Sequence, residues 1–345
     1  MWRNVPPSSK QHFRESHYEV RFLAKGSNGE TYLAIKMSVL NTICEEFNEQ
    51  KSIDKLCTGL RDNLVVVKFH KEDGGLDRRD LRDEINFLRS MPQGRPEITS
   101  LINFQMEGPC QWFTTKFIPA GTLHDLVRDT AKAVHVGLQY HFALEIVKAL
   151  ALVHFQVTDF ATMAPQTRRV ISHGDIHGGN LLVRPTDTEY GMDIVLADFG
   201  RAQQPLTGST NEDSLRRTRC DDYRNLGYLM EGIFIAARIG TAGKACEHRA
   251  GPNIDCQNCI RVAGRYGLLP YLEPEEKELQ EWAYKFKVLS LTDDKELFEF
   301  LKAFVAEAQT LRARHWKPIN NIKGHLKDQG LSRKDLLRIV GLDRY

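Results

Sequence analysis

The sequence predicts an α+β fold in two parts, a small antiparallel sheet with one helix and then a larger, mainly α-helical part. Three observations indicate this fold. Residues 18–37 alternate apolar and polar side chains on both sides of a glycine turn, "GSNG". Residues 63–91 pass from a β-branched run to helical spacing, and beyond residue 120 the apolar residues recur mostly at helical intervals.

Composition limits the class of protein before any motif is considered. With 345 residues, 41% of them hydrophobic, the chain can bury one large core or two medium ones. Its formal net charge of +2 provides no strong field for a nucleic acid or a membrane surface, so we expect neither as a partner. The seven cysteines are an odd, scattered set, and no secretory signal or run of about 18 apolar residues is present. We therefore expect a cytoplasmic protein, and the oligomeric state stays open.

The first part begins with two strands joined by "GSNG". A mixed, partly helical insertion follows at about 38–62. The run "NLVVVKFH" predicts the next strand, and residues 76–91 have helical spacing at Leu81, Ile85 and Leu88. The order is therefore strand, strand, insertion, strand, helix.

The second part begins where "QWFTTKFIPAGTLHDLV" leaves a strand through Pro119 and Gly121 and enters a helix. We place the first part at 1–117 and the second at 118–345. Residues 141–155 predict a core helix, and two short strands, "LLVRP" and "DIVLADFG", accompany the stretch "SHGDIHGGNLLV". Helical periodicity resumes at residue 221 and is interrupted by a loop rich in Cys and Gly at 240–265.

Two polar turns carry the chemistry of the second part. Asp175, His177 and Asn180 lie among glycines on a predicted loop, and Asp198 follows the next apolar strand in "ADFG". Asn180 and Asp198 offer hard oxygen ligands of the kind that Mg²⁺ takes together with phosphate oxygens. Asp175 remains as a candidate base.

A second set of candidates lies upstream. Gly26 and Gly29 allow close backbone approach at the turn, and Lys68 projects from an apolar strand. A buried lysine needs a partner, and Glu84 on the following helix can supply it. Lys36 competes for the role of Lys68, but it lies only seven residues after Gly29 and belongs on the second strand of the hairpin.

This ordered set resembles the protein kinase superfamily over roughly residues 18–235. The segment "LAKGSNGETYLA" is similar to the glycine-rich loop, "VVVKF" to the lysine strand, "DEINFLRSM" to the glutamate helix and "TTKFIPAGTL" to the hinge. The segment "HGDIHGGN" is similar to the catalytic loop and "DFG" to the metal-binding turn. The resemblance implies a two-lobed protein-kinase-like fold and an ATP- and Mg-dependent phosphotransferase, with a divergent Ser/Thr protein kinase favoured.

The resemblance also assigns roles to residues. It implies that Asp175, Lys68, Glu84 and His177 are catalytic and that Asn180 and Asp198 hold magnesium. The nucleotide-binding residues would be Gly26, Ser27, Gly29, Lys68, Lys116 and Ile118. Asp222, in "RCDDYRNLGYLM", would brace the backbone of the catalytic loop, with a helix N-cap as the simpler alternative.

Four departures leave the acceptor open. Ala24 and Asn28 replace a glycine and an aromatic residue of the glycine-rich loop, and Gly174 replaces an arginine that reads activation-loop phosphate. His177 stands where Ser/Thr kinases usually have lysine and small-molecule kinases often have histidine. Only 24 positions separate Asp198 from Asp222, and "RRTRC" is all that could replace the peptide platform. A small-molecule, aminoglycoside-like kinase acting on a hydroxyl acceptor and a catalytically silent pseudokinase acting as a binding module are the alternatives.

The stretch "CEHRAGPNIDCQNC" permits a structural zinc site. Cys246 and His248 are separated by one residue and Cys256 and Cys259 by two, so both pairs could close a tetrahedral site on tight turns. The simpler interpretation is that these residues pack in a core or lie on the surface.

Overall fold

The structure is a computed structural model that divides into two compact units. It describes residues 13–25, 29–70, 78–106, 111–130, 135–157, 159–162, 171–203, 212–239, 274–291, 293–316 and 331–342. Unit 1 comprises Met1–Pro119 with Asp328–Tyr345, and unit 2 comprises Ala120–Lys327. The fold is α+β with a small antiparallel sheet, as predicted. The C-terminal segment differs from the prediction, because it joins unit 1 rather than the second part of the chain.

Unit 1 contains a five-stranded antiparallel sheet in the order β1-β2-β3-β5-β4. Its strands are β1 (His17–Lys25), β2 (Gly29–Lys36), β3 (Leu64–His70), β4 (Leu101–Gln105) and β5 (Trp112–Lys116). The predicted hairpin is confirmed by β1 and β2, whose register runs from His17 opposite Lys36 to Lys25 opposite Glu30. Strand β4 was not predicted, because it is a short edge strand whose register shifts between Leu101 and Asn103.

The predicted insertion consists of two helices, α2 (Met37–Gln50) and α3 (Ile53–Asp62). Lys51 takes a left-handed conformation that ends α2, and the Ser52 side chain then caps α3 by accepting from the Lys55 N–H. Near the C-terminus, α12 (Arg333–Ile339) begins with a capping box formed by Ser332 and Asp335. These caps explain where α2 ends and where α3 and α12 begin.

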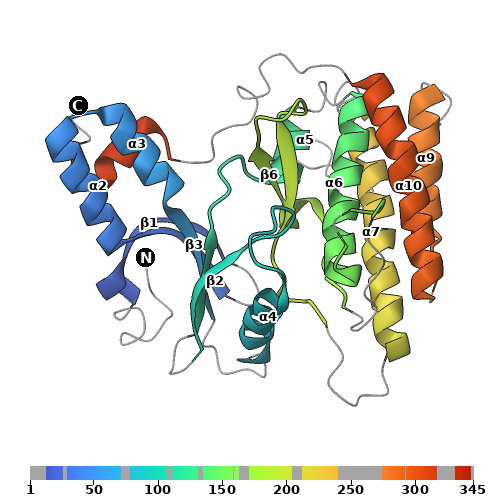
Figure 1. Ribbon diagram of the computed structural model, residues 1–345, viewed down its shortest axis with the longest axis horizontal. Coiled ribbons are helices and arrows are strands. Elements are labelled where there is room, and N and C mark those ends of the chain that lie inside the picture. The colour runs from blue at the N-terminus through green and yellow to red at the C-terminus, as the bar shows by residue number, and fades with distance from the viewer. Residues whose placement is uncertain are drawn as a thin grey trace. The chain divides into compact units, whose positions relative to one another are not determined.

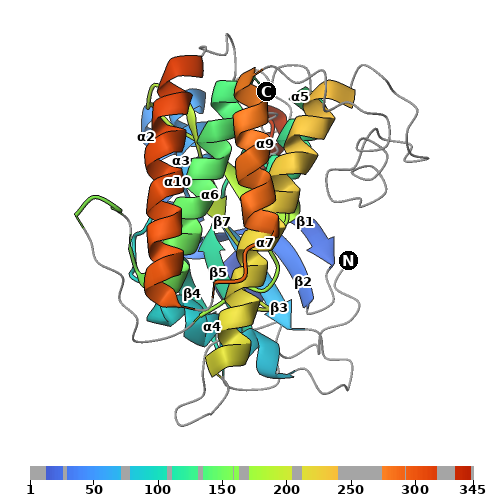
Figure 2. The ribbon, with the colours of Figure 1, turned by 90° about the vertical axis from the view of Figure 1, so that its right-hand side faces the viewer.

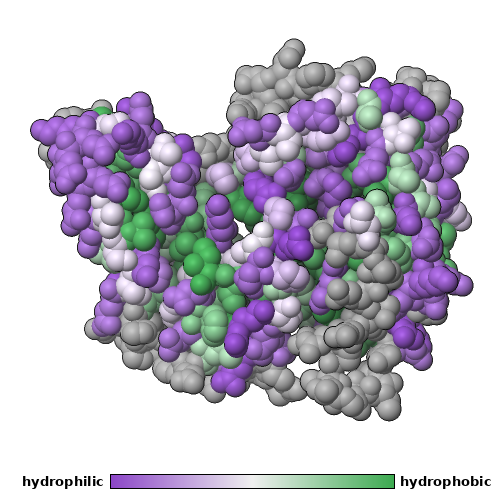
Figure 3. All heavy atoms as spheres, in the orientation of Figure 1, coloured by the Kyte–Doolittle hydropathy of each residue, from purple (hydrophilic) through white to green (hydrophobic). Residues whose placement is uncertain are grey.

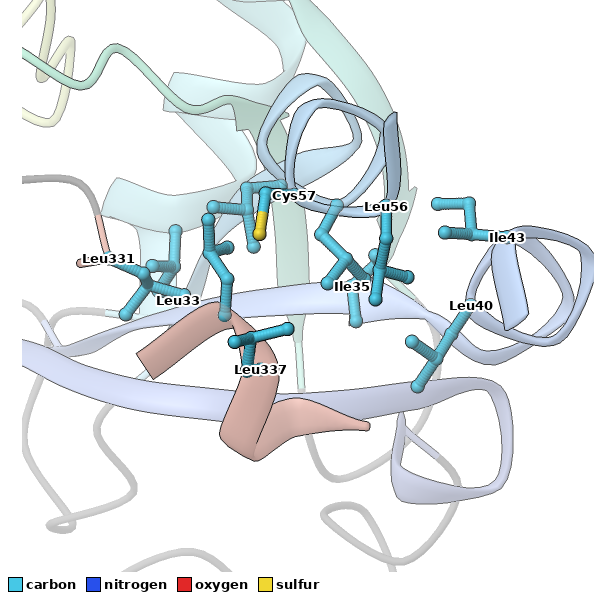
Figure 4. Close-up of a cluster of buried hydrophobic side chains, with 11 residues drawn as sticks. Leu33, Ile35, Leu40, Ile43, Leu56, Cys57, Leu331 and Leu337 are labelled. Carbon is cyan, nitrogen blue, oxygen red and sulfur yellow. The ribbon is translucent and has the colours of Figure 1, made fainter. Parts of the chain in front are cut away.

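Helices α2, α3 and α12 bury their apolar faces together on β2. Figure 4 shows side chains from all four elements pointing toward one another. The buried cluster is Leu33, Ile35, Leu40, Ile43, Leu56, Cys57, Leu60, Leu64, Leu331, Leu336 and Leu337. The surface over α2 is mostly hydrophilic in Figure 3, as expected of a helix with one buried face. Residues from both ends of the chain therefore form one core.

Alternate residues of β2 contribute to a second cluster. Tyr32 and Ala34 pack with Phe13, Val67, Phe69 and Trp112, whereas Leu33 and Ile35 belong to the first cluster. This division follows from the period of two along a strand. Helix α4 (Arg78–Ser90) also belongs to unit 1, and its predicted apolar positions Leu81, Ile85 and Leu88 are all buried.

Unit 2 is a set of helices packed around α6 (Val136–Phe155), as Figures 1 and 2 show from two directions. The others are α5 (Leu123–Thr130), α7 (Glu212–Ile239), α9 (Pro274–Lys287) and α10 (Asp294–His315). Helix α6 packs against α7, α9, α10 and β7, so burial extends almost around its circumference rather than along one face. Helix α7 begins at Glu212, nine residues before the point predicted from the periodicity.

Among the described residues, one helix, α6, has the length and the apolar composition that a membrane-spanning helix needs. Of the stretch that meets this criterion, 89% is buried inside the structure. That burial is typical of a core helix.

Two short strands form a hairpin in unit 2. Strands β6 (Leu181–Pro185) and β7 (Met192–Leu196) pair antiparallel, with Leu181 opposite Leu196. The 3₁₀ turn η1 (Gly178–Asn180) immediately precedes β6. Because β6 begins beside the end of β7, the loop that enters β6 and the loop that leaves β7 lie next to each other.

Candidate functional site

In unit 1 the predicted lysine and glutamate form an ion pair. The Lys68 Nζ on β3 donates to the Glu84 Oε2 on α4 at 2.8 Å. The neighbours of Lys68 along the strand, Val67 and Phe69, are buried in the second cluster, so alternation directs the lysine away from that cluster. The predicted partnership is confirmed.

Burial explains why this pair is needed. The Lys68 side chain is 15% exposed and that of Glu84 3%, so either charge alone would be costly. The ammonium also lies 6.0 Å from the centre of the Phe113 ring. Lys36, the competing lysine, ends β2 and is exposed, as expected of the second hairpin strand. The contact with Glu84 therefore fixes the position of the Lys68 ammonium on β3.

The predicted glycine turn, "GSNG", stands between strands β1 and β2 in the sequence. A Cβ on Gly29 would lie 1.9 Å from the Phe69 carbonyl oxygen, so β2 approaches β3 at a distance that only glycine permits. Gly26 and Ser27 lie outside the described residues. Lys116 ends β5, and Ile118 follows it in a half-buried position.

In unit 2 the catalytic-loop candidates lie together. The Asn180 Nδ2 donates to the backbone oxygen of Asp175 at 2.9 Å and to its Oδ2 at 3.3 Å. Two acceptors on one side fix which end of the amide is the nitrogen. Asn180 ends the turn η1, which brings it back to Asp175.

Two more side chains contact the Asp175 carboxylate, which is 28% exposed. The Arg201 Nη1 donates to Oδ1 at 3.2 Å, and the His177 Nε2 lies 3.7 Å from Oδ2. The hydrogen bond from the adjacent His177 imidazole, more than the charge of Arg201, holds the pKa of Asp175 below its usual value. Asp175 is therefore an ionised carboxylate at neutral pH.

Asp198 has an unusual backbone conformation. Its φ is +58°, and the other non-glycine residues with positive φ in the described chain, Lys51 and Gln156, both end helices. A side chain in this region costs free energy, and such costs are common at functional sites. The N–H of Ala197 donates to the backbone oxygen of Asn180 at 2.9 Å, so the two predicted magnesium ligands lie on neighbouring backbone.

Asp222 braces the backbone of the loop that carries Asp175. Its fully buried carboxylate accepts from the N–H of His173 at 2.7 Å, the N–H of Gly174 at 2.8 Å and the Nε2 of His154 at 3.0 Å. The predicted brace is confirmed. The alternative of a helix N-cap is wrong, because Asp222 lies inside α7 rather than at its start.

Sequence reasoning missed His154 and the role of its neighbour Tyr223. His154 donates through Nε2 to Asp222 and accepts through Nδ1 from the Tyr223 hydroxyl at 2.9 Å. Burial lowers the pKa of His154, which suits a neutral ring with this tautomer. The available signal was weak, since a lone histidine near the end of a core helix usually only packs.

His173 and Gly174 have separate structural roles. The His173 ring is buried, contacts Phe199 edge to face at 4.8 Å, and accepts from the Asp175 N–H while donating to the Ala197 oxygen. Burial lowers the pKa of His173. Gly174 has φ +77°, and a Cβ there would lie 2.7 Å from the Arg201 oxygen. A glycine at this position is therefore explained by geometry.

The predicted residues thus form two groups, Lys68 with Glu84 in unit 1 and Asp175, His177 and Asn180 with the adjacent Asp198 in unit 2. Cys246, His248, Cys256 and Cys259 lie outside the described residues. Among the residues that are described, no group of three or more His, Cys, Asp or Glu side chains could hold a metal ion. No protein-family model matches the chain, and no curated protein matches it.

Proposed function

We propose that this protein is an ATP- and Mg-dependent phosphotransferase, with a protein Ser/Thr hydroxyl as the favoured acceptor. The observation that carries the proposal is the geometry around Asp175. An ionised carboxylate is held by Asn180, in a loop whose backbone is anchored by the buried Asp222. Phosphoryl transfer needs positioning and charge neutralisation more than covalent help, and this loop provides a rigid place for both.

The donor set in unit 1 fits the phosphates of ATP. Lys68 carries a positive charge that Glu84 orients on a rigid strand. Gly29 begins β2 beside β3, the strand that carries Lys68. The resemblance to the protein kinases implies that Lys68 contacts the phosphates of ATP.

The residues of unit 2 fit magnesium. The amide of Asn180 directs its nitrogen at Asp175, and none of the described residues donates to its Oδ1, which leaves that oxygen for a cation. Asp198 provides an exposed carboxylate on the neighbouring turn. Two protein oxygens are typical of Mg²⁺, which takes its other ligands from phosphates and water. When bound, the ion would neutralise phosphate charge.

In the proposed reaction, Asp175 accepts a hydrogen bond from the acceptor hydroxyl and receives its proton as the bond from that oxygen to the γ-phosphorus forms. The bond between the γ-phosphorus and the bridging oxygen breaks, and ADP leaves. Because the pKa of Asp175 is lowered, its main contribution is to orient the hydroxyl. Lys68 stabilises the charge on the phosphates during this exchange.

A small-molecule hydroxyl is the second candidate acceptor, and the start of α7 favours it. We predicted that "RRTRC" was the only segment available as a peptide platform, but residues 216–220 lie within α7. Arg219 is buried and pairs with Asp294 on α10, and Cys220 is buried as well. At most residues 200–211 remain between "DF" and this helix, which is a short segment on which to rest a peptide.

Incubation with γ-labelled ATP, Mg²⁺ and cell lysate tests the proposal and separates the acceptors. Label should appear in the protein fraction or in the small-molecule fraction with the wild type and disappear with Asp175→Ala. The exposed Asp187→Ala is the matched control and should transfer label normally. Lys68→Ala should lose on the order of 10² or more in rate.

The result that contradicts the proposal is a wild type that labels neither fraction above the Asp175→Ala background. Binding of Mg·ATP without transfer would then indicate the pseudokinase alternative. A thermal shift with millimolar Mg·ATP separates that case from a protein that does not bind nucleotide.

A further inference from the structure

The guanidinium of Arg201 lies on the candidate catalytic carboxylate. Its Nη1 donates to the Asp175 Oδ1 at 3.2 Å, and its side chain is 64% exposed. Its Nε and Nη2 donate to none of the described residues. An arginine has five N–H groups in a planar fork, so contact with one carboxylate oxygen leaves donors for another anion. Arg201 is thus a charged side chain at the centre of the site to which no role has been assigned.

The backbone around Arg201 is held against the catalytic loop. Ser172 and Gln203 exchange two backbone hydrogen bonds, each of 3.0 Å. The close approach of the Arg201 oxygen to Gly174 fits the same antiparallel contact, which a side chain at 174 would prevent. Arg201 therefore has a position set by the fold.

Arg201 is also the permanent positive charge among the described side chains that contact Asp175. Asn180 is neutral. The Nδ1 of His177 accepts from the Gly179 N–H at 3.1 Å, so that nitrogen carries no proton and the ring is neutral in this arrangement. During transfer, negative charge develops on the phosphoryl oxygens, which lie close to the acceptor hydroxyl. In the proposed function Asp175 holds this hydroxyl, so an arginine beside Asp175 is within reach of the phosphoryl oxygens.

We propose that Arg201 is a catalytic residue that donates to the phosphoryl group while it is transferred, and so acts as an arginine supplied by the same chain. This inference rests on the proposed function. No proton moves to or from Arg201. It lowers the free energy of the transition state by donating to the oxygens on which charge develops, and it keeps its contact with Asp175 through Nη1.

The test uses the full-length protein and two readouts. Arg201→Gln should lower kcat on the order of 10²-fold or more with a smaller change in the KM for ATP, and Arg201→Lys should recover part of the loss. Arg184→Gln is the matched control, because Arg184 forms a 2.8 Å ion pair with Asp193 on the β6–β7 hairpin. It should leave kcat unchanged. Millimolar guanidinium should partly restore Arg201→Ala but not Asp175→Ala.

The second readout does not depend on turnover. Aluminium fluoride with ADP and Mg²⁺ mimics the planar phosphoryl group, so Arg201→Gln should weaken its binding at least tenfold while ADP with Mg²⁺ binds as to the wild type. Equal binding and equal kcat in Arg201→Gln would overturn the inference. A higher kcat would overturn it too, and would make the pair with Asp175 an inhibitory contact. If the wild type itself neither binds ADP nor transfers phosphate, the proposed function fails first.

Discussion

At the scale of single residues, the candidate site depends on one buried carboxylate. Asp222 accepts from two backbone N–H groups of the loop and from His154; His173 and His154 are buried, and Gly174 is half-buried. A buried carboxylate is stable when it accepts several hydrogen bonds. If these bonds are broken, a buried donor left without an acceptor costs free energy, as does a buried carboxylate left without donors. The position of Asp175 therefore depends on a residue that it does not contact.

Asp222→Ala should lower the free energy of unfolding by about 2–5 kcal/mol, because three donors, two of them buried, lose their acceptor. Urea denaturation measures the change. Asp221→Ala is the control, because Asp221 is exposed and pairs with Arg224 one turn along α7. It should change the free energy by less than about 0.5 kcal/mol. Equal effects of the two variants would show that the brace contributes nothing.

Asp198 offers a prediction in which stability and activity separate. Asp198→Gly should raise the free energy of unfolding by about 1 kcal/mol, because glycine adopts φ +58° without strain, and should lower the rate of transfer on the order of 10²-fold. Asp198→Ala should lose the same activity without the gain, since it keeps the strained Cβ. Melting curves with matched rate assays check both. A glycine variant less stable than the alanine variant would contradict the account of strain.

At the scale of elements, the C-terminal helix completes the core of unit 1. Leu331, Leu336 and Leu337 join side chains of α2, α3 and β2 that lie about 300 residues earlier in the chain. Two short helices on one face of a small sheet have little apolar surface to share, so a third helix adds burial that the insertion could not obtain alone.

Leu336→Ala should destabilise unit 1 by about 2–5 kcal/mol, because the fully buried side chain leaves a cavity among α3 and β2. Lys334→Ala, on the exposed side of the same helix, should change stability by less than about 0.5 kcal/mol. Hydrogen exchange of the α3 amides measures the effect locally. Unchanged protection of α3 in Leu336→Ala would show that α12 does not support the core.

At the scale of the whole molecule, the pH dependence of stability should come largely from unit 2, because three of its histidines are buried. Burial is the main cause that lowers the pKa of His141, His154 and His173 below the ordinary value of about 6.5. Each ring is hydrogen-bonded in its neutral form, for example His141, which accepts from Arg312 and donates to the Met192 oxygen. Protonation would place a further charge in the core, and for each ring the cost of burying that charge exceeds the attraction of the nearby carboxylates.

Because these pKa values are lower in the folded than in the unfolded protein, the unfolded state binds more protons below about pH 6.5. Stability is therefore complete above that pH and should fall as the pH decreases from about 6.5 towards 5. Hydrogen exchange of the α6 amides across this range measures it. His154→Gln keeps one donor and one acceptor but cannot titrate, so its stability should fall less steeply with pH. A stability that rises on acidification would contradict this prediction.

Local pattern was enough to predict much of this molecule. The alternation around "GSNG", the β-branched run before Lys68 and the spacing of Leu81, Ile85 and Leu88 are signals within single elements, and the structure contains the strands and helix that they indicate. The pairing of Lys68 with Glu84 could also be predicted, because a charge on a buried strand requires a partner and the next helix offered one. These inferences needed only neighbours along the chain.

Tertiary structure alone decided the rest. His154 meets Asp222 across 68 positions and Arg201 meets Asp175 across 26, and neither contact leaves a periodic signal in the sequence. The same holds for α12, whose short amphipathic pattern does not say which core it covers. The packing of whole elements determines which side chains far apart in sequence come into contact. That packing depends on the free energy of the complete core rather than on any one segment.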